Sequence, residues 1–525
     1  MTTDKPDKWL VMIYMAGNNS LGEDCVAALT QMAEANISDN IAVFAQLNTD
    51  VHKATTLQIT NATTVDGIHD QLNKAIAAQA WSGEREEERE ASHKQKIFTF
   101  VESCLEKFRA DHFMLVLSGH GAGVEPFLIE NTGANSFTVI NLGELIETIN
   151  KKLLRERRID ILGLDSCLMS MTEIAYIVHK HVKVMIGAEG FEPKAGWPYP
   201  KVLERISQTS NDIHALSKAI VCDYIKHYTV FQAANVSVDQ AACDVKNGAV
   251  PLMKAIHSLG AALGESLEKF NKSKREINAD VRDAVVLAHW EAQLYKNEQY
   301  VDLYDFCTLL KQRLNNEAHF PIRRACQNVL NAVLGTEQQK KIEKEANEFE
   351  AELADPDFKA PMSDDEGFMR PVNFRDPHDV PGFVLKSCYS GWAVQYSFGV
   401  SLYFPWSEVP SDLEEYRKLF FSHDSRWPEF LETYFEATKR HARPGQLEST
   451  SYRYHFLRSG FNVSQGAGFT AGFVTGRNAE PNKNAEPNKS LTNLVGSMKN
   501  PATDFSKCAC EGDSVRAGTS ESKRR

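Results

Sequence analysis

Long hydrophobic runs are missing from this sequence of 525 residues. The first apolar run, residues 9–16, is far shorter than the stretch of about 20 apolar residues that a helix needs to cross a bilayer. We therefore expect no signal peptide and no membrane-spanning helix, and we do not expect a membrane as a partner.

A disulfide framework is also missing. The ten cysteines are scattered without regular spacing, which indicates reduced thiols and favours a cytoplasmic location. The pair Cys508-Ala509-Cys510 has no second pair with which it could form a metal site. No EF-hand loop or similar ladder of acidic residues is present, so we assign no metal-ligating residue.

An excess of basic residues is absent as well. The chain has 58 Lys and Arg against 70 Asp and Glu, a formal net charge of −12. This balance argues against a general nucleic-acid-binding protein, which needs a basic surface. An acidic protein can attract basic substrates, although solubility alone explains the charge equally well.

Short apolar stretches alternate with amphipathic ones in the first part of the chain. We expect strands at 9–16, 41–47, 112–117, 159–164 and 182–187. Strands that alternate with helices predict an α/β/α sandwich with a mostly parallel sheet. Residues 1–240 would form this domain and residues 241–440 a mixed, helix-rich C-terminal domain. Residues 441–525, which contain a short polar repeat at 478–489, have the composition of a disordered tail.

Cys167 follows the predicted strand at 159–164. Ser170 and Glu173 then have the S-x-x-E spacing of a capping box, which predicts a helix start. Cys167 would therefore lie between the carboxyl end of a strand and the amino end of a helix, where ligands collect in open α/β sheets. The positive end of the helix would favour the thiolate. A second S-x-x-E motif, Ser20 to Glu23, follows the first strand.

His120 follows the predicted strand at 112–117 and has a glycine on each side. If the two strands are neighbours, His120 and Cys167 emerge at the same edge of the sheet. This placement predicts a cysteine–histidine dyad, with Cys167 as nucleophile. The glycines let the backbone approach a substrate closely, and the N–H groups of Gly121 and Cys167 are candidate oxyanion donors.

Several blocks of this sequence resemble the clostripain family of cysteine peptidases, which has a caspase-like fold. They are the strand and SGHG block at 115–121, DSCLM at 165–169, EPKAGWPY at 192–199, VMIYMAGNN at 11–19, YVDLYDF at 300–306 and SLYFP at 401–405. The resemblance covers roughly residues 8–435. It implies a cysteine endopeptidase that cleaves peptides or proteins after Arg and, less readily, Lys, with His120 as the acid–base partner of Cys167. The chemistry requires no cofactor, and calcium is implied as a possibility by the family alone.

Three acidic residues are candidates for binding a basic substrate side chain or for adding negative field around it. Asp165 lies two residues before Cys167, on the same face of the strand, with a Cα separation of about 7 Å. Its carboxylate could pair with Arg or Lys of the substrate, although a structural hydrogen bond at the strand end is the alternative. Glu189 and Glu192 lie on the next loop at this edge and are the further candidates, which could add negative field.

Two other functions remain open at this stage. A catalytically idle relative could serve as an interaction scaffold, but both His120 and Cys167 are present. A nucleotide-binding protein is suggested by the glycines at 119–123, but their spacing is not G-x-G-x-x-G.

The resemblance also implies self-cleavage between the histidine and the cysteine. Residues 121–150 contain no Lys or Arg, and Lys151 and Lys152 lie in a predicted helix. We therefore expect a single chain that is not cut there, or one that is cut elsewhere.

Overall fold

The core of the protein is a mixed sheet of nine strands in the order β12-β13-β7-β6-β5-β4-β1-β2-β3. The structure is a computed structural model that describes residues 7–49, 54–82, 93–128, 137–208, 212–231, 236–271, 274–296, 298–336, 339–340, 344, 372–375, 382–405 and 413–438. The strands are β1 (Trp9–Ala16), β2 (Ile41–Asn48), β3 (Thr55–Ile59), β4 (His112–Ser118), β5 (Ile159–Asp165), β6 (Val182–Gly187), β7 (Val238–Asp244), β12 (Val372–Arg375) and β13 (Val384–Ser390).

The five central strands, β2, β1, β4, β5 and β6, are parallel. β3 adds to one side in the antiparallel direction, and β7, β13 and β12 extend the other side with antiparallel pairs. β1 and β5 are buried along their whole length, as expected for strands covered on both faces. The predicted α/β fold with a mostly parallel sheet is confirmed.

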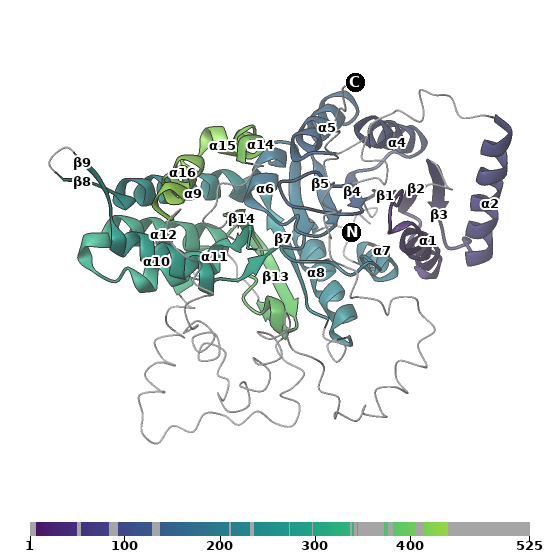
Figure 1. Ribbon diagram of the computed structural model, residues 1–525. Helices are drawn as coiled ribbons and strands as arrows, with labels where there is room; N and C mark the ends of the chain where they lie inside the picture. The colour runs from purple at the N-terminus through teal and green to yellow at the C-terminus, as the bar shows by residue number, and fades with distance from the viewer. Residues whose placement is uncertain are drawn as a thin grey trace, which may run out of the picture.

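Helices cover both faces of the sheet (Figure 1). One face carries α4 (His93–Lys107), α5 (Val139–Lys152) and α6 (Thr172–Val178), and the other carries α1 (Gly22–Gln31), α2 (Val65–Ser82), α7 (Tyr199–Gln208) and α8 (Ile213–Thr229). Successive side chains of a strand point to opposite faces. In β1, Met12 and Tyr14 therefore join one apolar core, and Val11 and Ile13 join the other.

The later part of the chain is rich in helices and packs beside the sheet (Figure 1). Its helices are α9 (Val245–Leu267), α10 (Ala279–Glu291), α11 (Leu303–Arg313), α12 (Phe320–Leu334), α14 (Leu413–Arg417), α15 (Phe420–Asp424) and α16 (Trp427–Thr438). Its short strands are β8 (Glu268–Asn271), β9 (Lys274–Ile277), β10 (Leu294–Tyr295), β11 (Tyr300–Asp302) and β14 (Ser401–Tyr403). The described residues also include 3₁₀ turns at η1 (Met32–Glu34), directly after α1, and at η3 (Glu317–His319) and η5 (Trp392–Val394) in this later part. One apolar core runs from Leu10 to Ala437 and so joins the sheet to these helices.

The predicted boundary at residue 240 falls inside β7. β13 and β12 of the later segment return to the same sheet, so the sheet itself is not divided there. The division into folding units stays a prediction, and residues 441–525 lie outside the described residues. Within the described part of the chain, no helix combines the length and the apolar character that crossing a membrane requires.

The carboxyl ends of the parallel strands meet at one edge of the sheet. Met15 of β1 pairs in register with Ser118 of β4, and Ser118 pairs with Asp165 of β5. The segments that contain Ser20, His120 and Cys167 follow these three strands directly. This edge therefore brings together side chains that lie far apart in the sequence.

Candidate active site

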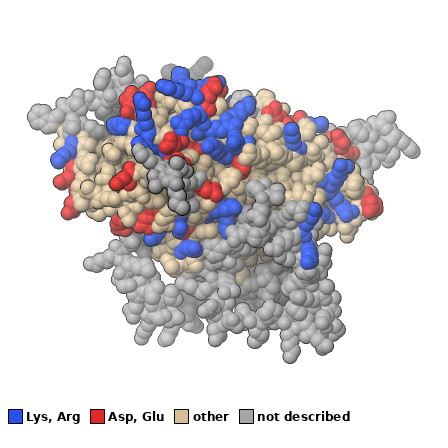
Figure 2. All heavy atoms as spheres, turned by 180° about the vertical axis from the view of Figure 1, so that it is seen from behind, with Lys and Arg blue, Asp and Glu red and all other residues tan. Residues whose placement is uncertain are grey.

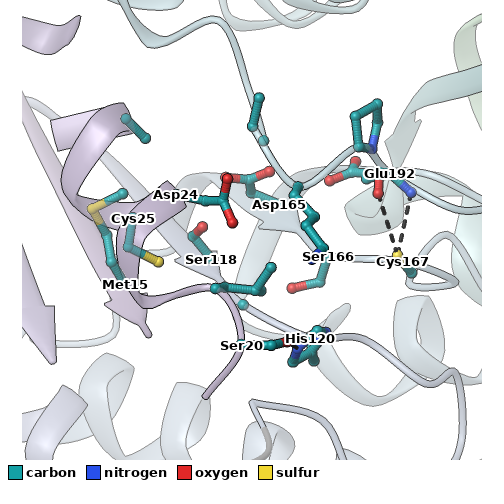
Figure 3. Close-up of a pocket in the computed structure, with 17 residues that line it drawn as sticks. Met15, Ser20, Asp24, Cys25, Ser118, His120, Asp165, Ser166, Cys167 and Glu192 are labelled. Carbon is teal, nitrogen blue, oxygen red and sulfur yellow. Dashed lines mark hydrogen bonds between the residues drawn. The ribbon is translucent and has the colours of Figure 1, made fainter. Parts of the chain in front are cut away.

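A pocket opens at this edge of the sheet, between the ends of β1, β4 and β5, the start of α1 and the loop at 192–196 (Figure 3). It encloses about 640 Å³ of space, part of which is open to solvent. His120 and Cys167 both line it. The structure thus brings the two predicted catalytic residues into one pocket.

The thiol of Cys167 is held by the backbone of Glu192 (Figure 3). The Glu192 N–H donates to Cys167 Sγ at 3.2 Å, and the thiol lies 3.8 Å from the Glu192 carbonyl oxygen. A hydrogen bond donated to sulfur favours its charged form. The next residue, Leu168, has a φ of +64°, so the chain turns sharply just after the thiol. Cys167 is half-buried rather than fully enclosed.

The predicted capping box at Ser170 and Glu173 is wrong. α6 begins at Thr172 without a side-chain cap, and Ser170 Oγ instead donates to the carbonyl oxygen of Gly399 at 2.8 Å. The Glu173 carboxylate is buried and accepts the N–H of Tyr403 at 3.0 Å. Both polar side chains bind the later segment of the chain, so the helix starts beyond the thiol, and the donor seen at the sulfur is a loop N–H.

The imidazole of His120 is oriented by a residue that the sequence did not reveal. Its Nε2 lies 3.0 Å from the hydroxyl oxygen of Ser20 in the segment after β1. Burial lowers the pKa of His120, and the positive charge of Lys194 lowers it further. The imidazole is therefore neutral near pH 7. The S-x-x-E motif at Ser20 does not cap α1, which has Leu21 at its N-cap and no side-chain cap.

Gly121 lies directly against the backbone of Cys167. A Cβ atom at position 121 would stand 2.0 Å from the carbonyl oxygen of Cys167, so only glycine fits. The backbone of the segment after β4 thus approaches the backbone that carries the thiol, where an oxyanion would form.

Asp165 lines the pocket and is also held by structural hydrogen bonds. The Tyr199 hydroxyl donates to its Oδ2 at 2.6 Å, and Ser118 and the Trp197 backbone also bind it. Burial raises the pKa of Asp165, and these hydrogen bonds oppose the rise. Asp165 shares a further hydrogen bond with Glu192, whose pKa burial and the charge of Asp165 raise well above its usual range. The two carboxyl groups are therefore coupled to each other in the wall of the pocket.

The predicted role of Glu189 in substrate binding needs correction. Glu189 is fully buried and is not among the residues that line the pocket. Asp239 accepts the N–H groups of Glu189 at 2.7 Å and Gly190 at 2.9 Å, which turns this loop inward. The Glu189 carboxyl group then accepts the N–H of Gly399 and contacts Asp302, away from any substrate.

Among the residues that the structure describes, no group of three or more His, Cys, Asp or Glu is arranged to hold a metal ion. A calcium requirement stays a prediction from the family resemblance.

Comparisons with known proteins match most of the chain. A sequence model described as the clostripain family matches residues 13–434, from β1 to α16.

Three similar solved structures are C11 cysteine proteases. One, a secreted enzyme from Bacteroides thetaiotaomicron bound to an irreversible peptide inhibitor, is 14% identical and covers 80% of this chain and 99% of its own, with a TM-score of 0.46. A second secreted enzyme from that organism, iotapain, is 11% identical and covers 80% of this chain and 100% of its own, with a TM-score of 0.48. An inactive zymogen from Parabacteroides distasonis is 16% identical and covers 81% and 99%, with a TM-score of 0.45. Among curated proteins, no match was found.

The prediction of a cytoplasmic location is contradicted by these comparisons, because two of the similar structures are of secreted proteases. The prediction depends on scattered cysteines and on the lack of a long apolar run. A chain of this length can build a large core without disulfides, so the lack of a disulfide framework does not exclude export.

The buried carboxyl groups around Glu189 predict that stability falls as the pH rises. Burial raises the pKa of Asp302 to about 7 and that of Asp239 to about 6, and burial together with these two neighbours raises the pKa of Glu189 well above its usual range. Each group binds its proton more tightly in the folded state, so the free energy of unfolding decreases between about pH 4 and pH 7. Glu189→Gln mimics the protonated form, and we expect a smaller decrease.

Urea unfolding from about pH 5 to about pH 8 measures this dependence. Glu265→Gln, at an exposed position of α9, is the matched control and should behave as wild type. An unchanged pH dependence in Glu189→Gln would contradict the prediction.

Proposed function

Because the chain belongs to the clostripain family of cysteine peptidases, we propose that it is an endopeptidase that cleaves after Arg and, less readily, Lys. Cys167 is the nucleophile in this proposal and His120 is its acid–base partner. The observation that carries it is the shared pocket, in which the half-buried thiol, a neutral imidazole and several carboxyl groups meet.

The site supports amide hydrolysis in two steps. The sulfur of Cys167 attacks the scissile carbonyl carbon, and the thiol proton passes to His120. His120 then protonates the amine nitrogen as the C–N bond breaks, which leaves a thioester on Cys167. In the second step His120 takes a proton from water as the water oxygen attacks the thioester carbonyl carbon. The C–S bond then breaks, the acid product leaves, and the Cys167 thiolate takes the proton back from His120. A lowered pKa makes the imidazolium a stronger acid toward the leaving amine.

Close backbone packing supports Gly121 as an oxyanion donor. Its contact with the backbone of Cys167 puts its amide in the neighbourhood of the attacked carbonyl. Donors fixed at that point stabilise the negative charge of the tetrahedral intermediate. The amide of Cys167 itself is the second donor in this proposal.

Carboxyl groups in the pocket support a preference for basic residues. Asp165 lines the pocket that contains the thiol. On the face shown in Figure 2, Lys and Arg stand among Asp and Glu, so the net charge of −12 is not gathered into an acidic face there. We therefore attribute selectivity to the pocket and not to the overall charge.

Hydrolysis of fluorogenic peptides that end in Arg, Lys, Asp or Leu tests the function, with and without calcium. Arg peptides should be cleaved fastest, and Cys167→Ala should abolish cleavage, because Cys25, which also lines the pocket, is buried and its pKa is raised to about 12. His120→Ala should lower kcat by about 100-fold to 10,000-fold. Cys222→Ala, which removes the other half-buried thiol among the described residues, is the matched control and should keep wild-type activity.

Cleavage that continues in Cys167→Ala would contradict the mechanism, and equal cleavage of all four peptides would contradict the specificity. An interaction scaffold would cleave no peptide and would show no selective reaction of Cys167 with an Arg-directed thiol probe.

Ser20 should act as a positioning residue for His120. Its hydroxyl is the hydrogen-bond partner of Nε2, and that bond selects the tautomer and the orientation of the ring. Ser20→Ala should lower kcat by up to about tenfold with little change in KM, since one hydrogen bond is lost. Ser20→Thr keeps the hydroxyl and should restore kcat. Equal kcat values in wild type and Ser20→Ala would refute this role.

Self-cleavage between His120 and Cys167 should not occur within one molecule. Lys151 and Lys152 lie in the last turn of α5, and the following basic residues precede β5 at its amino end. That end is about 20 Å of strand away from the edge where Cys167 lies. Intact mass after long incubation at neutral pH should show one chain for both wild type and Cys167→Ala. Fragments cut between residues 121 and 167 in wild type alone would show that the prediction is wrong.

A further inference from the structure

The wall of the pocket opposite the thiol carries an acidic residue from a different element. Asp24 lies in the first turn of α1, lines the pocket and is half-buried. Figure 3 shows its side chain and that of Asp165 at the same end of the pocket. The hydrogen bonds of Asp165 occupy much of its capacity, whereas within the described part of the chain no hydrogen bond or ion pair joins the Asp24 side chain to another residue.

The carboxylates of Asp24 and Asp165 both line the pocket and both act on Cys25, another residue of its wall. Burial raises the pKa of Cys25 to about 12, and the charges of Asp165 and Asp24 contribute to the rise. Cys25 thus experiences both carboxylates, one from β5 and one from its own helix. Burial raises the pKa of Asp24, while the positive charge of Lys194, also in the pocket wall, lowers it. A positive charge in the pocket therefore favours the carboxylate form of Asp24.

A separate polar atom in the pocket wall has no partner. The hydroxyl oxygen of Ser166 is buried and makes no hydrogen bond to any residue that the structure describes. Ser166 lies between Asp165 and Cys167 and lines the pocket. A buried hydroxyl without a partner is costly, and a donor group of a bound substrate would satisfy it.

We propose that Asp24 is a specificity residue that binds the guanidinium group of a substrate arginine together with Asp165. This inference rests on the proposed function. A guanidinium group is planar and presents five N–H donors in a fork, so it can bind two carboxylates and a hydroxyl at the same time. An ammonium group is a point charge on a flexible stem and gains less from a second carboxylate. Asp24 therefore accounts for a preference for Arg over Lys.

The experiment compares peptides with Arg, Lys or citrulline at the cleavage position, because citrulline keeps the shape of Arg without its charge. The ratio of kcat/KM for Arg to that for citrulline is measured within each variant. A lower concentration of folded enzyme, or a slower bond-cleavage step, changes both kcat/KM values equally and leaves this ratio unchanged. Asp24→Asn should lower this ratio by about tenfold, the effect of losing one charge-assisted hydrogen bond, and should lower the Arg to Lys ratio as well. Glu23→Gln removes the same charge one residue away on the exposed side of α1 and should leave both ratios unchanged.

Three results distinguish the possible failures. The first is that Asp24→Asn has the same Arg to citrulline ratio as wild type, while Asp165→Asn loses the preference for Arg. This result overturns the role of Asp24 and keeps the proposed function. A wild-type enzyme that does not distinguish Arg from citrulline overturns the proposed specificity itself. Equal losses in Glu23→Gln and Asp24→Asn show a general field effect and also overturn a direct contact. The rate of Cys167 alkylation by iodoacetamide, which does not use the pocket carboxylates, should be the same in wild type, Asp24→Asn and Glu23→Gln.

Discussion

The carboxylate of Asp239 accepts hydrogen bonds from the N–H groups of Glu189 and Gly190, and the position of the thiol depends on these two bonds. They fix the loop after β6, so that the carbonyl oxygen of Gly190 accepts the N–H of Leu168 at 2.9 Å. Leu168 has a left-handed backbone conformation, which costs energy in a non-glycine residue and persists only where its surroundings hold it. A buried carboxylate on a neighbouring strand thus maintains the sharp turn that presents Cys167 to the pocket.

The later segment of the chain supports both loops of the site. The Tyr300 hydroxyl donates to the carbonyl oxygen of Ala122 at 2.9 Å and accepts the N–H of Val124 at 3.2 Å, which fixes the loop after His120. On the other side, the backbone of Gly399 donates to Glu189 and accepts from Ser170. These polar groups are buried at the junction, so removal of the segment would leave donors and acceptors without partners near both catalytic residues. The segment after β7 therefore belongs to the structure of the active site, through β11 and the loop before β14.

Much of this architecture could be predicted from the sequence, because it depends on local patterns. Apolar stretches identified β1, β4 and β5, and polar residues that directly follow parallel strands identified the edge on which His120 and Cys167 lie. The side-chain partners could not be predicted in this way. Both S-x-x-E motifs have the local form of a capping box, yet Ser20 binds His120 and Ser170 binds Gly399. A hydroxyl group takes the partner that tertiary packing brings to it, and the spacing within one helix carries no information about a segment more than 200 residues away.

For the same reason, the sequence alone could not identify all of the acidic residues that line the pocket. Position at the carboxyl ends of neighbouring strands selects Asp165 and the loop that contains Glu189 and Glu192. The direction of a loop side chain depends on what turns the loop, and Asp239 turns Glu189 into the core. Asp24 lies more than 140 residues before Cys167 and reaches the pocket only because β1 pairs with β4, and β4 with β5. At the edge of a parallel sheet, the segment that follows each strand is therefore a candidate for the site, because the carboxyl ends of all the parallel strands meet there. Here the segment after β1 lines the pocket together with the segments after β4 and β5.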